Sequence, residues 1–323
     1  MISRHLYREC FEGYVIVDCA VRERLAFSFL LSQLQDEGEE TEPNKRLVTY
    51  FLDDEDVGWG GYFGFPLSKI AVAQKPLAQT VLVSFDCAVA ALGSGANGME
   101  QPIPRGKNGA VDTSVHALTT IDGYVYAVGP WRSVARRVGP NQWESVADRQ
   151  GCMPSPKPNS WGSTNTGFDA IDAFSAEDIY CAGGEGDVWR FDGRCWHMCP
   201  MPTNLLMESI CCAGDGFVYI GLLGGGIVKG RENSWQVIHE AQMTLPFKDL
   251  VWYAGKVWAT SDHGLWVIEN DRVVEAEVPA EIKACSGNLS VGDGVMLLAG
   301  GYGAAVFDGK NWGSHHQQFC LRG

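Results

Sequence analysis

The 323-residue sequence contains no apolar run long enough to cross a bilayer. Its most apolar stretch spans only Leu25 to Leu34 and is interrupted by polar residues. Arg4 and Arg8 near the N-terminus are not followed by the apolar segment of an export signal. We therefore expect a cytoplasmic protein that does not contact membranes.

Basic residues are also scarce, with 25 Lys and Arg against 39 Asp and Glu and a formal net charge of −14. An acidic surface repels phosphates, which argues against direct contact with nucleic acid. It favours a basic protein partner, or it serves only to keep the chain in solution. Charge alone leaves both interpretations open.

The compact motifs of catalysis and metal binding are missing. No Gly-x-Ser-x-Gly elbow and no Cys-x-x-Cys pair is present. His315 and His316 are adjacent, so in a strand they would face opposite ways. The segment from Gly93 to Gly98 matches a dinucleotide-binding fingerprint, but Pro102 and Pro104 exclude the helix that would hold a pyrophosphate. We expect a turn there, and no cofactor, metal ion or catalytic residue in the chain.

Cysteine occurs eleven times, without the paired spacing of a disulfide framework. Several cysteines lie in apolar runs, as in the segment from Ile210 to Ala213. We expect them to be reduced core residues, as is usual in the cytoplasm.

A repeated pattern fills the second half of the chain. Each copy has two short β-prone runs separated by glycine, followed by a turn, which is Asp-Gly or Asn-Asp in three of the four copies, and an anchor residue. The anchors Trp196, Trp235, Val273 and Trp312 lie 39, 38 and 39 residues apart. An earlier copy ends at Trp143, and the longer step after it contains a proline-rich insertion.

Four short strands every 38 to 39 residues is the period of a propeller blade. Residues 110–318 repeat clearly, and residues 10–105 can form two degenerate copies. Because a blade cannot bury both faces alone, blades stack in a ring. We predict an all-β, closed β-propeller of about seven four-stranded blades in one domain, residues 1–323, with six or eight blades still open. Trp196, Trp235 and Trp312 should be buried at equivalent places between blades.

The best candidate for a binding surface is residues 36–65. Nine Asp and Glu residues lie between positions 36 and 56, and a Gly-rich aromatic segment follows at 58–65. Carboxylates steer a basic partner and aromatic side chains anchor it, although a solvated pair of loops would have the same composition. The predicted partner-binding residues, including one from the proline-rich insertion, are Asp36, Glu37, Glu39, Glu40, Asp53, Asp54, Glu55, Asp56, Trp59, Tyr62, Phe63 and Trp161.

The cadence Val-Tyr-x-x-Gly … Gly-x-Val-x-x-x-Asp-Gly-x-x-Trp resembles that of bacterial β-propeller repeat proteins, which share their architecture with WD-repeat and kelch proteins. The Gly-His and Trp-Asp dipeptides of true WD repeats are absent. The resemblance implies a platform for protein binding, and some proteins of this shape are immunity proteins encoded beside secreted toxins. The sharpest hypothesis is thus a cytoplasmic immunity protein that neutralises a basic toxin, such as a nuclease. Two alternatives remain: a propeller hydrolase or lactonase with a metal ion in the central channel, and a carbohydrate-binding lectin.

Overall fold

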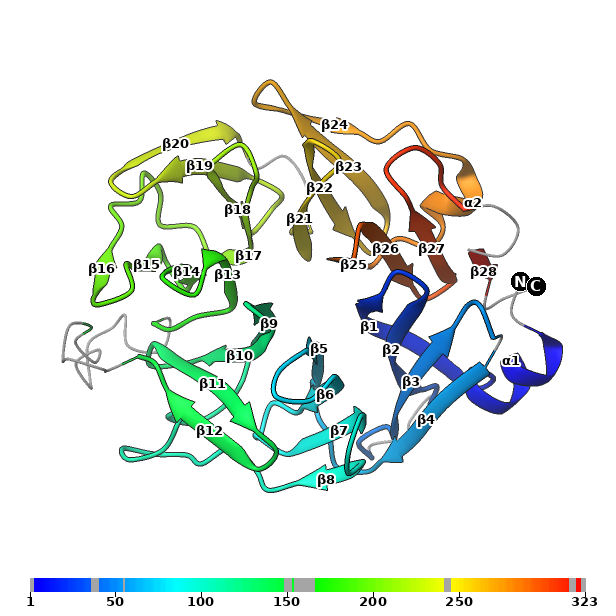
Figure 1. Cartoon of the computed structure of the whole chain (residues 1–323). Coiled ribbons are helices and arrows are strands. Elements are labelled where there is room, and N and C mark those ends of the chain that lie inside the picture. The colour runs from blue at the N-terminus through cyan, green and yellow to red at the C-terminus, as the bar shows by residue number, and fades with distance from the viewer. Residues whose placement is uncertain are drawn as a thin grey trace.

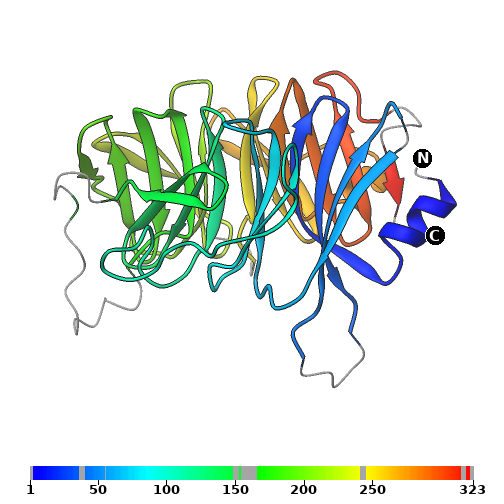
Figure 2. The ribbon, with the colours of Figure 1, turned by 60° about the horizontal axis from the view of Figure 1, so that its bottom comes forward.

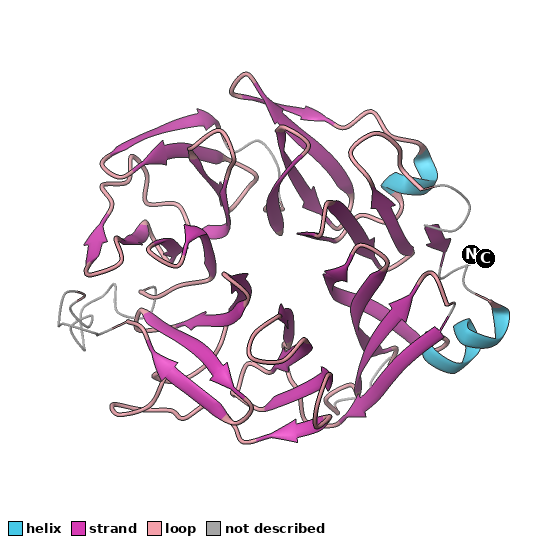
Figure 3. Ribbon diagram, viewed as in Figure 1, coloured by secondary structure: helices cyan, strands magenta, loops and turns pink. Residues whose placement is uncertain are grey.

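Seven four-stranded antiparallel sheets form a ring around a central channel (Figure 1). The computed structural model describes residues 3–35, 41–54, 56–147, 153, 166–240 and 245–313, and the backbone of 318–320. Within these residues the helices are short, α1 (Arg4–Cys10) and α2 (Ala280–Lys283), and Figure 3 shows both on the outer side of the ring. The predicted seven-blade β-propeller is confirmed.

We name the blades A to G in chain order, and the first strand of each lies at the channel. Blades A and B contain β1 (Tyr14–Glu23), β2 (Ala26–Gln33), β3 (Lys45–Phe51), β4 (Asp56–Tyr62), β5 (Lys69–Ala73), β6 (Gln79–Val83), β7 (Val89–Gly93) and β8 (Gly98–Glu100). Blades C and D contain β9 (Ala117–Ile121), β10 (Tyr124–Gly129), β11 (Ser133–Gly139), β12 (Gln142–Ser145), β13 (Ala170–Ser175), β14 (Asp178–Gly183), β15 (Asp187–Phe191) and β16 (Trp196–Met198). Blades E, F and G contain β17 (Met207–Cys212), β18 (Val218–Leu222), β19 (Ile227–Arg231), β20 (Ser234–His239), β21 (Asp249–Tyr253), β22 (Lys256–Ser261), β23 (Gly264–Glu269), β24 (Arg272–Glu275), β25 (Asn288–Gly292), β26 (Val295–Gly300), β27 (Gly303–Phe307) and β28 (Gln318–Cys320).

The core lies in the layers between neighbouring blades. Alternate residues of a strand face opposite sides of its sheet, so both sides of a blade are buried by different residues. In β2, Phe27 and Phe29 pack toward Leu297 of blade G, whereas Leu30 packs toward Leu82 of blade B. This arrangement explains why the second strands of the blades, such as β2 and β26, read as nearly continuous apolar runs.

The repeated tryptophans do join neighbouring blades. The Trp196 indole N–H donates to the Val146 carbonyl of the preceding connection at 3.1 Å, and the ring is buried. Trp235 packs edge-on against Tyr180, and Trp312 packs against Trp258 of blade F. Trp235 and Trp312 are only half-buried because they lie nearer the outer rim, so the expectation of equal burial was wrong for these two.

Two-residue turns close many of the hairpins. Asn270 and Asp271 have φ of 50° and 59°, the positive values that a type I′ hairpin needs. The fingerprint-like segment is a turn between β7 and β8, as predicted. There Gly93 has φ of 146°, and its N–H donates to the Asn97 side chain at 2.7 Å. A Cβ at Gly93 would lie 2.6 Å from the Ala78 carbonyl oxygen.

Antiparallel pairing gives each blade two distinct ends. We call one side of the ring the loop face. It contains the start of each first strand, the loop between the second and third strands, and the end of each fourth strand. The short turns after the first and third strands lie on the other side, the hairpin face. Figure 2 views the ring obliquely, with the ends of β2 and β3 projecting from its lower side, the loop face.

No blade combines strands from the two ends of the chain, so the ring closes by contact between blades A and G. Blade A comes entirely from the N-terminal part of the chain and blade G from the C-terminal part. The Val21 amide donates to the Ser290 hydroxyl at 3.0 Å, and the Arg24 amide donates to Asp293 at 2.8 Å. The two ends therefore meet along β1 and β25.

The cysteines require one correction. Cys195 is disulfide-bonded, so the expectation of reduced cysteines was wrong at this position. The free cysteines of the described part are nearly all buried, in agreement with a core role: Cys10, Cys19, Cys87, Cys181, Cys199, Cys211, Cys212 and Cys285.

Candidate functional site: the channel and its mouth

At every junction between neighbouring blades, a side chain in or just before an innermost strand donates or accepts a hydrogen bond. The donor–acceptor distances run from 2.7 to 3.0 Å. In ring order the bonds are Ile70 amide to Asp18, Thr120 hydroxyl to Val72 carbonyl, His116 ring with Asp169, Cys212 amide to Asp172, Ser209 hydroxyl to Phe247 carbonyl, Leu289 amide to Asp249, and Val21 amide to Ser290 hydroxyl. These polar residues thus fasten the blades to one another.

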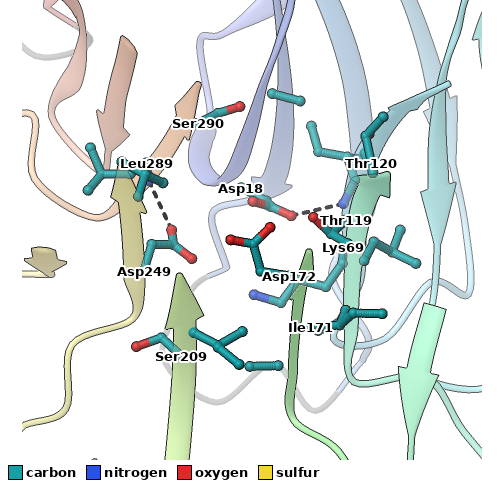
Figure 4. Close-up of a pocket in the computed structure, with 18 of the residues that line it drawn as sticks. Asp18, Lys69, Thr119, Thr120, Ile171, Asp172, Ser209, Asp249, Leu289 and Ser290 are labelled. Carbon is teal, nitrogen blue, oxygen red and sulfur yellow. Dashed lines mark hydrogen bonds between the residues drawn. The ribbon is translucent and has the colours of Figure 1, made fainter. Parts of the chain in front are cut away.

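Asp18, Asp172, Asp249 and Lys69 line the channel (Figure 4). Burial raises the pKa of both Asp18 and Asp172 from 3.8 to about 6, despite the backbone N–H groups that each accepts. Burial also raises the pKa of Asp249. The Asp18 carboxylate is the main cause of the raised pKa of Lys69, which stays protonated and partly balances the ring of acids.

The channel encloses about 1230 Å³ and is lined from the hairpin-face turns, as at Asp122, to the loop face, where Leu67 and Phe85 lie at its mouth. At this mouth the Phe85 ring stacks on His116 with centroids 5.4 Å apart, and the His116 ring contacts Asp169 at 2.7 Å. Glu208 follows on the next inner strand. Burial raises the pKa of the Glu208 carboxyl, and the neighbouring Asp169 carboxylate raises it further. The mouth therefore changes from apolar on one side to acidic on the other.

Leu67 stands at the same mouth in a strained conformation. Its φ is 40°, in the left-handed region, and 75% of its side chain is exposed. This backbone region costs a non-glycine residue about 1–2 kcal/mol, and exposing a leucine gives nothing back. Strain and apolar exposure at one residue indicate a role outside the fold of the isolated chain.

Among the described residues, no group of three or more His, Cys, Asp and Glu is arranged to hold a metal ion. The channel acids are instead occupied as blade-to-blade acceptors. No helix of the described part is long and apolar enough to span a bilayer.

The chain is similar to an immunity protein. It is 28% identical over 261 residues to Immune protein Tsi7 of Pseudomonas aeruginosa, covering 80% of this chain and 81% of that protein. No family model matches the sequence. The similarity therefore extends over about four fifths of both chains.

Solved structures agree on the fold. The WD40 β-propeller domain of Doa1 superposes with a TM-score of 0.56 at 14% identity, covering 89% of this chain and 90% of that one. The RRP9 WD40 repeats give a TM-score of 0.56 at 11% identity, covering 91% and 87%. At these identities the likeness concerns architecture alone.

The sequence-predicted surface does not form one patch. Asp53, Asp54 and Asp56 are exposed at the β3–β4 turn, on the hairpin face. Tyr62 and Phe63 lie at the opposite end of β4, the end that faces the β2–β3 connection. Asp36, Glu37, Glu39, Glu40, Glu55 and Trp161 lie outside the described residues. The length of β4 separates Asp53, Asp54 and Asp56 from Tyr62 and Phe63. These two groups therefore do not form the single docking surface that the sequence analysis predicted.

The three aromatic residues also differ from one another. Phe63 is 78% exposed on the loop face, as an anchor would be. Tyr62 is buried and packs against Phe65, so it is no contact residue. Trp59 is partly exposed on the outer strand β4, where Arg46 covers its ring at 4.6 Å and its indole N–H donates to Glu9 at 3.3 Å. Trp59 thus holds α1 against blade A.

The mouth residues Leu67, Phe85, Asp169 and Glu208 were missed by the sequence analysis. They lie in two connections between blades, one loop within blade B and one inner strand, and only ring closure brings them together. The available indication was an apolar residue placed between strand-forming runs, where a turn residue is expected.

Proposed function

We propose that this chain is a non-catalytic immunity protein that binds a toxin protein and blocks it by occupancy. The observation that carries the proposal is the 28% identity to Immune protein Tsi7 across four fifths of both chains. A propeller presents many loops on a rigid ring, which suits protein binding.

A basic toxin, such as a nuclease, suits the chemistry of this chain. The formal net charge is −14, and the field of such a surface speeds encounter with a cationic partner. We place the action in the cytoplasm, where the many free buried thiols are stable.

The alternatives lack a supporting feature in the described residues. A metal-dependent hydrolase would use channel carboxylates, yet Asp18 and Asp172 each accept two backbone N–H groups. A lectin would stack sugars on the repeated tryptophans, whereas Trp196 is buried between blades.

The test is capture and protection in the native host. The tagged chain is used to capture partners at 50 mM and 500 mM salt, and each captured protein is then expressed in cells that lack the chain. We expect a toxic protein that elutes at high salt and whose toxicity disappears when the chain is co-expressed. Capture of no toxic protein, or toxicity that persists with the chain present, would overturn the proposal.

A further inference from the structure

Exposed apolar side chains gather on one face of the propeller. Loops and turns of the hairpin face expose Leu25 and Phe217 among the described residues. The loop face exposes many more: Leu34, Phe63, Leu67, Phe85, Leu205, Leu206, Leu223, Leu245 and Tyr302. Apolar groups concentrated on one side of a ring mark a surface that another protein covers.

The channel mouth lies within this face and adds acidic groups to it. Leu67 and Phe85 form one side of the mouth, and Asp169 and Glu208 form the other. Glu208 makes no hydrogen bond or ion pair with another residue of the described part. Its carboxyl lies beside Asp169, which is already paired with the His116 ring at 2.7 Å, so Glu208 is the acid of the two for which the described residues provide no ion pair.

We propose that the loop face is the docking surface for a basic protein, which covers Phe63, Leu67 and Phe85 and inserts a Lys or Arg side chain between Asp169 and Glu208. The inference rests on the proposed function only for the identity of that protein as a toxin. Apolar contacts at the rim exclude water, and a cation at the mouth relieves the repulsion between two neighbouring carboxylates.

Charge complementarity selects this occupant over a second copy of the chain. A second copy would bring its own net charge of −14 against an acidic mouth. A cationic partner instead gains from the same field. The partner we commit to is therefore a heterologous basic protein.

The first experiment locates the cation site without the toxin. A hexa-arginine peptide with a terminal benzoylphenylalanine is photo-cross-linked to the folded chain, and the adducts are mapped by mass spectrometry. We expect adducts at 63–68, 84–88 and 205–208. Glu208→Gln should weaken peptide binding about threefold at low salt, while the hairpin-face control Glu177→Gln changes it less than twofold. Adducts confined to the hairpin face, or equal effects of the two variants, would overturn the proposal.

The second experiment uses the captured toxin. Leu67→Ala and Phe63→Ala should each speed its dissociation at least tenfold in surface plasmon resonance, because both remove a highly exposed apolar anchor of the loop face. Leu25→Ala removes a leucine that is 41% exposed on the hairpin face and should leave dissociation unchanged. Circular dichroism confirms that the variants fold.

The outcomes separate the two proposals. If no toxin is captured, the proposed function fails and the peptide adducts still decide the docking face. If a toxin is neutralised but Leu25→Ala and Leu67→Ala dissociate alike, the function stands and the docking face is wrong. A wild-type dimer that Leu67→Glu converts to a monomer would show a second copy on this face and would also overturn the inference.

Discussion

Trp196 connects blade D to the connection that precedes it through both its ring and its indole N–H. It packs on Phe168 and Phe191 and donates to the Val146 carbonyl. Trp196→Ala leaves a large cavity and should lower the free energy of unfolding by about 3–5 kcal/mol. Trp235→Ala, at the half-buried repeat position, should cost clearly less. Urea unfolding of both variants measures the difference, and equal losses would contradict the burial argument.

Asp172 makes stability depend on pH. A carboxyl whose folded pKa lies above its unfolded value binds more protons when folded. With a rise from 3.8 to about 6, its stabilising contribution is present below about pH 4 and is lost as pH rises through 6. Asp172→Asn removes this titration. The stability advantage of wild type over the variant should therefore shrink by about 1–2 kcal/mol between pH 4.5 and pH 7.5, allowing for water in the channel.

Urea unfolding at the two pH values tests this prediction. Glu177→Gln, an exposed turn residue, is the control and should show no such change. The same difference between wild type and Asp172→Asn at both pH values would show that Asp172 does not titrate in this range.

At the scale of elements, substitutions in the β3–β4 turn test whether its acids only attract the toxin at long range or also contact it in the complex. Converting Asp53, Asp54, Glu55 and Asp56 to their amides removes four charges from the hairpin end of blade A. Association with the toxin should slow at 50 mM salt through the weaker long-range field and match wild type at 500 mM. Dissociation should stay unchanged, because the turn does not reach the loop face. Faster dissociation of this variant would show that the toxin contacts the hairpin face.

The strands could be predicted from the sequence where the repeat period was regular, whereas the binding surface could not be predicted. The regular spacing from Trp196 to Trp312 predicts the blades directly, because each blade packs against its neighbours in the same way. Glu42 and Asp53 are close in sequence, yet β3 lies between them and carries its two ends to opposite faces. Glu208 and Leu67 come together only across the ring, so no local pattern could place them at one mouth.

For the whole molecule, closure depends on side chains at the seam between blades A and G. Ser290→Ala leaves the Val21 amide without its acceptor and should cost about 1–2 kcal/mol of unfolding free energy. Ser175→Ala, which removes a local turn acceptor for Glu177, should cost less. Hydrogen exchange at the Val21 amide should accelerate in Ser290→Ala. An unchanged exchange rate would show that the seam does not need this bond.

The central claim is that the whole propeller acts by occupancy rather than by chemistry. The direct measurement is a titration of the captured toxin's activity with increasing amounts of this chain, followed by the intact mass of the toxin. We predict a linear loss that reaches zero at a one-to-one ratio, an unchanged toxin mass, and recovery of activity when high salt separates the complex. Complete loss far below equimolar chain, or a changed toxin mass, would contradict the account and identify an enzyme.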